Sequence, residues 1–96
     1  MARQRNTTVS GRAFDEKIIE AVWNKAQIIE DKDPAEYRSD IVGNTIYRGS
    51  YGKETILGWE IDYIKPVPKG GTDELDNLQA LNSAANAKKG NLYPRP

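Results

Sequence analysis

The sequence contains no cysteine and no histidine. Without cysteine, the chain has no disulfide, no thiolate ligand for zinc and no cysteine nucleophile. Without histidine, it lacks the side chain that most often acts as a general base near neutral pH, and also the commonest nitrogen ligand for metals. Carboxylates, amides, tyrosines and lysines remain for chemistry. Any bound metal is therefore expected to be a hard cation that prefers oxygen ligands.

Long apolar runs are also missing, because no window approaches the roughly 20 apolar residues of a membrane span. The first dozen residues, MARQRNTTVSGR, are polar and do not resemble a secretion signal. We therefore expect no membrane association and a cytoplasmic location. The chain has 96 residues, of which 38% are hydrophobic and 29% are charged. This length and composition predict one globular domain with a compact core.

The chain has no excess of either charge, but its charges are unevenly distributed. A net charge of zero argues against indiscriminate binding of polyanions. Residues 1–12 carry three arginines and no acid, and they predict a flexible basic arm that either contacts phosphates or has no role. Residues 13–40 hold eight acids against four bases. The acidic run over 30–40 predicts a solvated face, and a docking surface for a partner protein is the alternative.

Hydrophobic periodicity predicts an α+β fold. Apolar residues recur at helical spacing between Ile18 and Trp23, after a capping Asp15, which predicts a helix over 15–27 and places Trp23 in the core. The stretch from Asp33 to Glu36 has the capping signature of a short helical turn. Residues 41–42 and 45–47 predict two short strands or an irregular turn, and residues 48–53 predict a loop.

The second half of the chain predicts a strand, a loop, a strand and a helix. Residues 55–64 alternate in the manner of a strand, which Pro66 ends. A polar loop rich in proline and glycine follows, and then a short returning strand over 78–81. Asn82 can cap a helix over 83–89, and Gly90 stands where helices usually stop.

An ordered set of residues in this half resembles the HNH endonuclease family. The set is Trp59-Glu60-Ile61-Asp62-Tyr63, Pro66, Lys69-Gly70-Gly71, Asn77-Leu78-Gln79 and Asn86-Ala87-Lys88-Lys89-Gly90. The resemblance is close over about a third of the chain and looser upstream. It implies one HNH-like domain over 13–96, in which a ββα-metal (His-Me finger-like) motif occupies about 58–91. It also implies hydrolysis of DNA phosphodiesters by a metal ion held against the scissile phosphate.

The resemblance assigns roles residue by residue. Asp62 and Asn86 would be the metal ligands, Tyr63 stands where the family's histidine takes a proton from water, and Asn77 matches an asparagine that braces the loop and the base. Magnesium is the implied cofactor, with manganese or nickel as alternatives, and no structural zinc is expected. The implied partner is double-stranded DNA. The lysines that would meet its phosphates are Lys65, Lys69, Lys88 and Lys89.

Each of these positions also has a simpler interpretation. Magnesium needs only one or two protein oxygens, so Asp62 and Asn86 suffice for a weak site, but Asp62 can also be a solvated strand carboxylate. Strand alternation points Asp62 and Tyr63 to opposite faces unless the strand bends. Asn77 can satisfy loop backbone groups without catalysis. Lys88 and Lys89 can complement the negative end of a helix.

Tyr63 is a poor general base. A phenol has a pKa near 10 and imidazole one near 6.5, so only about one phenol in a thousand is ionised at neutral pH. General-base assistance is worth about a hundred- to ten-thousand-fold in rate, and its loss predicts an impaired nuclease. Tyr63 can instead simply fill the histidine's volume on the Trp59 face. Three hypotheses follow: a slow metal-dependent nuclease, a nucleic-acid-binding module that does not cut, and a protein-interaction domain.

Overall fold

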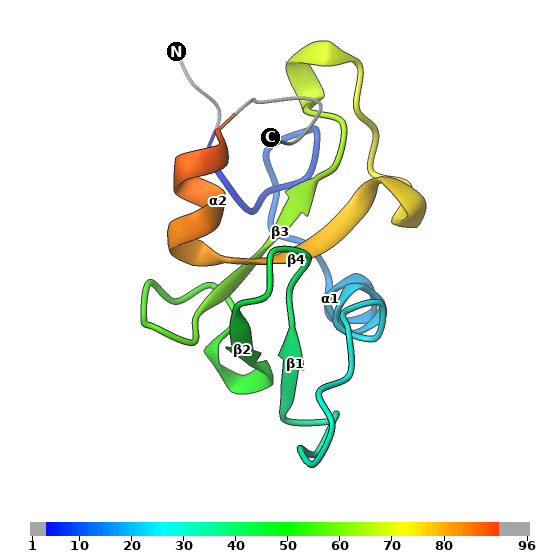
Figure 1. Ribbon diagram of the computed structural model, residues 1–96. Helices are drawn as coiled ribbons and strands as arrows, with labels where there is room; N and C mark the ends of the chain where they lie inside the picture. Colours follow the sequence, from blue (N-terminus) through cyan, green and yellow to red (C-terminus); the bar gives the residue numbers. More distant parts are fainter. Residues whose placement is uncertain (1–3, 91–96) are drawn as a thin grey trace.

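The computed structural model describes residues 4–90 and has the predicted α+β composition (Figure 1). The two helices of the described residues are α1 (Glu16–Trp23) and α2 (Ser83–Lys89). The strands form two antiparallel pairs, β1 (Tyr37–Ser39) with β2 (Thr45–Tyr47), and β3 (Trp59–Tyr63) with β4 (Leu78–Asn82). Single 3-10 turns cover Arg48–Ser50, Val67–Lys69 and Leu75–Asn77.

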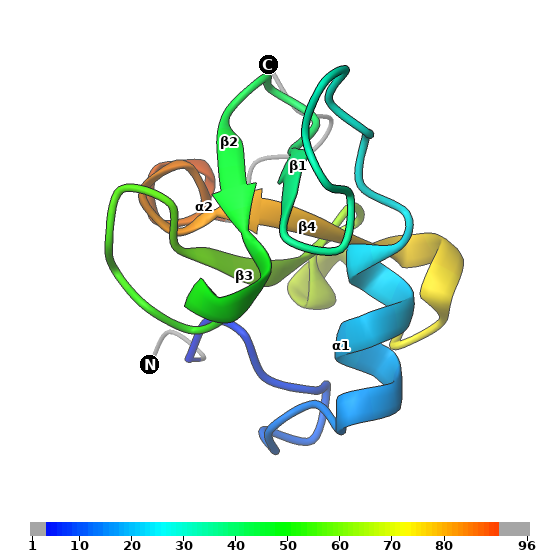
Figure 2. The same cartoon turned by 90° about the horizontal axis from the view of Figure 1, so that it is seen from below.

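The β3–β4 pair is the centre of the fold, and both helices contact it from different sides (Figures 1 and 2). Its register is regular from Trp59↔Asn82 to Tyr63↔Leu78. Strand side chains alternate between faces, so Trp59, Ile61 and Tyr63 share one face and Glu60 and Asp62 share the other. The first face packs into the apolar core, and the second faces α2.

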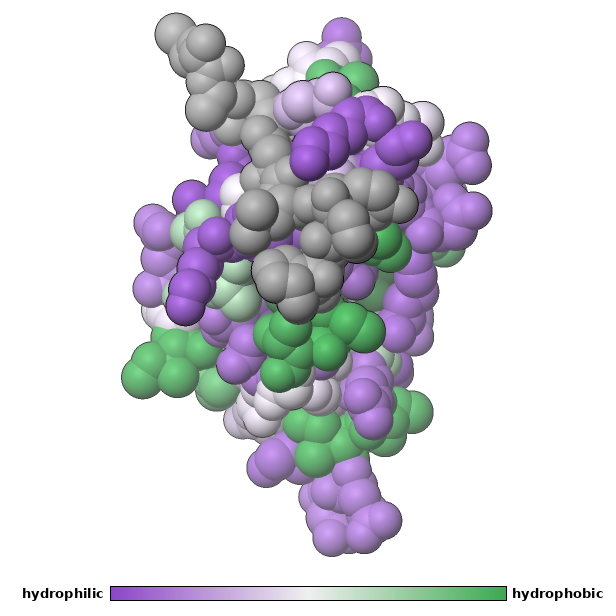
Figure 3. Space-filling view, turned by 45° about the horizontal axis from the view of Figure 1, so that its top comes forward, coloured by the Kyte–Doolittle hydropathy of each residue, from purple (hydrophilic) through white to green (hydrophobic). Residues whose placement is uncertain are grey.

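The core lies on the α1 side of this pair. Trp23 and Trp59 are 1% and 0% exposed, and their ring centroids are 5.2 Å apart. The prediction that Trp23 packs in the core is confirmed. Figure 3 shows that the surface apolar residues lie in separate small patches on the face it displays. Within the described residues, no helix is long and apolar enough to cross a membrane.

Helix α1 is shorter at its C-terminal end than the predicted 15–27. Asp15 caps it as expected, and its side chain accepts a hydrogen bond from the Ile18 N–H (3.0 Å). The helix ends at Trp23 because the following chain turns so that Gln27 can pair with Ser39 in an antiparallel bridge. This long-range pairing overrides local helical propensity.

The segment over 33–47 differs from the prediction in two places. The helical turn after Asp33 forms, and its carboxylate accepts a hydrogen bond from the Ala35 N–H (2.9 Å). Residues 45–47 form the predicted strand, but their partner is 37–39, and residues 41–42 lie in the turn between the two strands. Asp40 is 2% exposed, so this acid is not part of a solvated face.

Helix α2 has the predicted bounds, 83–89. The Asn82 side chain accepts a hydrogen bond from the Ala85 N–H (3.2 Å), and Gly90 ends the helix with a positive φ of 53°. The returning strand β4 is one residue longer than the predicted 78–81, and β3 is shorter than the predicted 55–64. The predicted strand–loop–strand–helix order is therefore confirmed.

The described part of the predicted basic arm contacts the domain. The Asn6 side-chain oxygen accepts hydrogen bonds from the Ile61 N–H (2.8 Å) and the Tyr51 hydroxyl (2.9 Å), and Thr7 is 8% exposed. This segment passes beside β3 in Figure 2. The expectation of a flexible arm is therefore corrected for these residues, because Asn6 supplies an acceptor for an N–H at the edge of β3. Residues 1–3, like 91–96 at the end of the motif, lie outside the described residues.

Candidate functional site

The face of β3 that meets α2 carries two buried carboxylates. Glu60 and Asp62 are two residues apart on the strand, and they are 6% and 5% exposed. Asn86 and Lys89 come from α2, where a spacing of three residues places both on one face of the helix. They are 5% and 6% exposed. The structure thus brings together the two predicted metal ligands, Asp62 and Asn86, in a polar layer between β3 and α2.

Asp62 is held from two sides. Gln79, its partner across the β3–β4 pair, donates from Nε2 to Asp62 Oδ2 (2.8 Å). Lys89 Nζ lies 3.1 Å from Asp62 Oδ1 and donates to the Tyr63 carbonyl oxygen (3.0 Å). Buried charges need such partners, because an unpaired charge is costly to remove from water. Asp62 is therefore an ion-paired, buried carboxylate, and the interpretation as a solvated strand residue is wrong.

Asn86 is oriented by the second carboxylate. Its Nδ2 donates to Glu60 Oε1 (2.8 Å), and Arg5 Nε donates to the same oxygen (3.1 Å). The hydrogen bond to Glu60 is the main reason that the pKa of Arg5 is raised above its usual value. Asn86 Oδ1 accepts no hydrogen bond from any described residue. Because Nδ2 of Asn86 faces Glu60, the side-chain oxygen of Asn86 points away from Glu60.

A pocket of about 300 Å³ opens beside these side chains. Its lining includes Asp62, Asn86 and Lys89, together with Arg5, Asn6 and Tyr63. Carboxylate and amide oxygens fit the hard-cation chemistry of magnesium, which keeps several waters and needs few protein ligands. Among residues 4–90, no three histidine, cysteine or carboxylate side chains gather as a metal cluster. The donor atoms fit a weakly held cation, and the Lys89 ammonium lies against the same carboxylate.

Tyr63 points its ring away from Asp62. The β3–β4 register continues through both residues without a bulge, so the strand does not bend to bring their side chains to one face. The Tyr63 ring packs against Phe14 with centroids 6.3 Å apart, and Tyr63 is 6% exposed. Its hydroxyl donates to the Thr7 carbonyl oxygen (3.0 Å) and contacts the Asp73 carboxylate. The interpretation of Tyr63 as an aromatic on the Trp59 face therefore describes this geometry.

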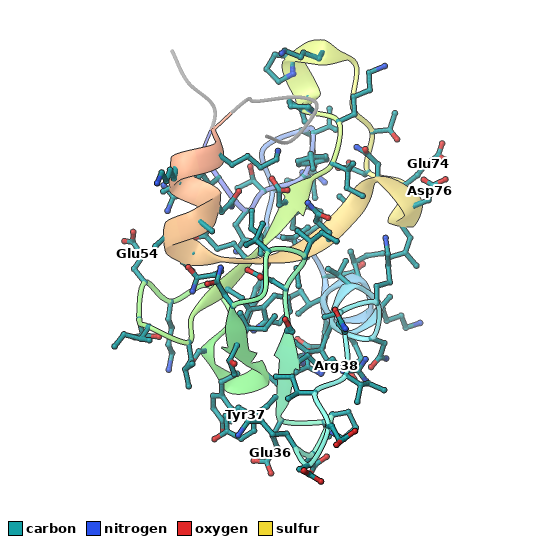
Figure 4. All side chains as sticks on the ribbon, in the orientation of Figure 1. Glu36, Tyr37, Arg38, Glu54, Glu74 and Asp76 are labelled. Carbon is teal, nitrogen blue, oxygen red and sulfur yellow. The ribbon has the colours of Figure 1, made fainter. Side chains whose placement is uncertain are left out.

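Asn77 braces the loop between β3 and β4. Its side-chain oxygen accepts from the Lys65 N–H (2.8 Å), and its Nδ2 donates to the carbonyl oxygens of Lys65 (3.1 Å) and Thr72 (3.0 Å). Gly70 has a φ of +97°, and a Cβ at Gly71 would lie 1.7 Å from the Lys65 carbonyl oxygen. The two glycines and Asn77 thus fix one compact loop conformation. Glu74 and Asp76 project outward from the end of this loop (Figure 4).

Three of the four predicted phosphate-binding lysines are exposed. Lys65 and Lys69 lie in the braced loop, and Lys88 lies in the last turn of α2. Lys89 is different, because its ammonium is buried against Asp62. A phosphate contact of Lys89 stays a prediction, and in this structure its ammonium contacts Asp62 instead. Its position one residue after an exposed lysine gives no sign of this in the sequence.

Sequence reasoning missed four residues that hold the predicted ones in place. Glu60 and Gln79 orient the predicted ligands within the polar layer. Arg5 forms an ion pair with Glu60, and the Asp73 carboxylate contacts the Tyr63 hydroxyl. The alternation of Glu60 with Asp62 on one strand was a usable signal for the first. Arg5 is 55 residues from Glu60, and Asp73 reaches Tyr63 only because the loop folds back, so the folded chain is needed to reveal both.

Comparison with known proteins adds one finding. Residues 50–92 match the family model described as HNH endonuclease, and this range contains β3, β4 and α2. No curated protein and no solved structure matches the chain.

Proposed function

We propose, on the premise that residues 50–92 belong to the HNH endonuclease family, that the chain is a metal-dependent DNA phosphodiester hydrolase with impaired activation of water. The β3–loop–β4–α2 order is the order of a ββα-metal unit. The family supports a nuclease-like function acting on nucleic acid. Double-stranded DNA, metal dependence and the impairment are the finer parts of the proposal.

Asp62 and Asn86 would hold the metal, most simply magnesium, with manganese or nickel as alternatives. Bound there, the cation would supply Lewis-acid stabilisation of charge on the phosphate. The protein's own contribution is to orient both oxygens through Gln79 and Glu60. Asn77 holds the loop that carries Lys65 and Lys69, and these two lysines together with Lys88 would meet the phosphates.

The observation that carries the proposal is the state of Tyr63 at the position of the general base. A phenol is almost entirely protonated at neutral pH, and here its hydroxyl donates to the Thr7 carbonyl oxygen and contacts Asp73. These two contacts turn the hydroxyl away from the face of β3 that carries Asp62. Residue 63 still borders the pocket that Asp62 and Asn86 line. A base restored there would border the same pocket.

The experiment is plasmid nicking with Mg²⁺ at pH 7 by the parent and by Tyr63→His. Histidine supplies a base with a pKa near 6.5, so we expect nicking to increase by about a hundredfold or more. Tyr63→Phe is the matched control, because it changes the same ring without adding a base, and it should show no gain. Asp62→Asn in the Tyr63→His background should remove the gain. A folded Tyr63→His variant that nicks no faster than the parent would count against the proposal.

A nucleic-acid-binding module that does not cut is the second candidate. The observation that favours it is the ion pair between Lys89 and Asp62, which occupies the carboxylate that a metal would need. This candidate predicts salt-dependent DNA binding by the parent and no nicking by Tyr63→His. The third hypothesis, a protein-interaction domain that uses the acids over 30–40, loses one of its acids, because Asp40 faces inward.

A further inference from the structure

We infer that Lys89 is an internal counter-ion that competes with a divalent cation for Asp62 and thereby weakens metal binding by this domain. The inference rests on the proposed function for the identity of the metal ligands, and it adds a residue that controls their availability. Its basis is the contact between β3 and α2 at the pocket already described.

The two side chains depend on each other because both are buried. Lys89 and Asp62 have side chains only 3% and 5% exposed, and Nζ lies 3.1 Å from Oδ1. At this depth water stabilises neither charge well, so each needs the other, and removal of one leaves the other uncompensated. Lys88, the neighbouring residue on α2, is exposed and makes no such contact within the described residues.

The ammonium sits among oxygens of the kind that a hard cation would use. Lys89 Nζ contacts Asp62 Oδ1 and the Tyr63 carbonyl oxygen (3.0 Å). Asn86, one helical turn earlier, has a side-chain oxygen that accepts no hydrogen bond from the described residues. Carboxylate, carbonyl and amide oxygens are the donors that bind magnesium and manganese. Lys89 and a metal therefore require the same carboxylate oxygen.

Charge balance points in the same direction. Lys89 places one positive charge beside the carboxylate that a metal would bind, and Arg5 is shared between Glu60 and Glu54. A divalent cation at Asp62 would be repelled by the Lys89 ammonium. Metal affinity is therefore expected to rise when the Lys89 charge is removed.

Mn²⁺ binding to the full chain, without DNA, tests this inference. Lys89→Met keeps an unbranched side chain and removes the ammonium. Titration followed by the electron paramagnetic resonance signal of free Mn²⁺ should give a dissociation constant about ten- to a thousand-fold lower than that of the parent. The control, Lys17→Met, removes an exposed ammonium from α1 and should bind Mn²⁺ as the parent does. Adding Asp62→Asn to Lys89→Met should abolish the gain in Mn²⁺ affinity, because residue 62 then has no carboxylate to bind the cation.

The melting temperature provides a second readout. Mn²⁺ should raise it in Lys89→Met by more than in the parent, because the metal replaces the missing counter-ion. If Lys89→Met does not fold, Lys89→Gln carries the same test, because its amide can still donate to the Tyr63 carbonyl oxygen. The inference is overturned if neither neutral variant gains Mn²⁺ affinity or refolds in saturating Mn²⁺. It is also overturned if the Asp62→Asn double variant binds as tightly as Lys89→Met.

These outcomes are separate from those of the nicking experiment. Tight Mn²⁺ binding by Lys89→Met with no nicking by Tyr63→His would keep the counter-ion role and reject the nuclease. Nicking by Tyr63→His with unchanged Mn²⁺ binding in Lys89→Met would do the reverse.

Discussion

At the scale of single residues, two tyrosine hydroxyls hold the N-terminal segment against β3. Tyr63 donates to the Thr7 carbonyl oxygen, and Tyr51 donates to the side-chain oxygen of Asn6. Asn6 in turn accepts from the Ile61 N–H, so it connects Tyr51 with the strand that carries Asp62. The predicted catalytic position and the predicted arm are therefore parts of one hydrogen-bonded structure.

Tyr51 should make stability sensitive to alkaline pH. Burial is the main cause that raises its pKa above the usual value near 10, so the folded state keeps the phenolic proton to higher pH than the unfolded state does. The contribution of the protonated Tyr51 hydroxyl to the free energy of unfolding is then fully present below about pH 10, and it is lost as the pH rises through the folded-state pKa. Denaturant unfolding of the parent and of Tyr51→Phe at several pH values measures this contribution.

At pH 7, Tyr51→Phe should lower the free energy of unfolding by about 0.5–1.5 kcal/mol, which is the usual net contribution of one hydrogen bond. The difference in free energy of unfolding between the parent and Tyr51→Phe should become smaller above pH 10. Tyr47→Phe is the control, because the Tyr47 hydroxyl has no hydrogen-bond partner in the described part of the chain, and its loss should cost less stability at pH 7. If the difference in free energy of unfolding between the parent and Tyr51→Phe is the same at pH 7 and pH 11, deprotonation of Tyr51 is not linked to unfolding.

At the scale of elements, Asp40 fastens the β1–β2 hairpin to the end of β4. Its carboxylate accepts hydrogen bonds from the backbone N–H groups of Val42 (3.1 Å) and Asn44 (2.8 Å) in the hairpin turn. It also accepts from the N–H of Asn82 (2.9 Å), the residue that caps α2. A single buried carboxylate thus sets how the hairpin sits relative to the strand that leads into α2.

Replacing Asp40 should destabilise the whole domain. Asp40→Ala leaves three backbone donors without their acceptor, and we expect a loss of about 2–4 kcal/mol in the free energy of unfolding. Glu36→Ala is the control, because Glu36 is an exposed acid of the same segment, labelled in Figure 4, and its loss should cost about 0.5 kcal/mol or less. Urea denaturation measures both. Equal, small effects in the two variants would contradict the role assigned to Asp40.

Some helices and strands could be predicted from the sequence with their bounds, and others could not. Helix α2 was predicted with its bounds because Asn82 and Gly90 are strong local signals at its two ends. Strand β1 was missed because its three residues become a strand only by pairing with β2. At the candidate site, the ordered motif singled out Asp62 and Asn86, which line one pocket, and their role as metal ligands stays a prediction. Burial of Lys89 was not predicted, because it depends on how closely α2 packs against β3.

At the scale of the whole molecule, the zero net charge means that any DNA binding must come from a local cluster of cations. Lys65, Lys69 and Lys88 are exposed, and they lie in the loop and the helix next to the pocket. Each phosphate contact adds about 0.9 to the slope of log K against log salt concentration. Binding by these lysines should therefore weaken steeply as salt rises.

Fluorescence anisotropy with a short labelled duplex, measured at several salt concentrations, tests this cluster. Lys69→Gln should weaken binding and lower the salt slope by about one. Lys17→Gln, which removes an equally exposed lysine from α1, should leave both unchanged. If the two variants behave alike, the phosphate-binding surface lies elsewhere on the molecule.

We propose that residues 50–92, which match the HNH endonuclease model, form a nuclease unit without an effective base at residue 63. Plasmid nicking by Tyr63→His with Mg²⁺ at pH 7, beside the parent and Tyr63→Phe, tests it most directly. Tyr63→His should cleave about a hundredfold or more faster than the other two, as expected for regained general-base assistance. A folded Tyr63→His protein that cleaves no faster than Tyr63→Phe would contradict it.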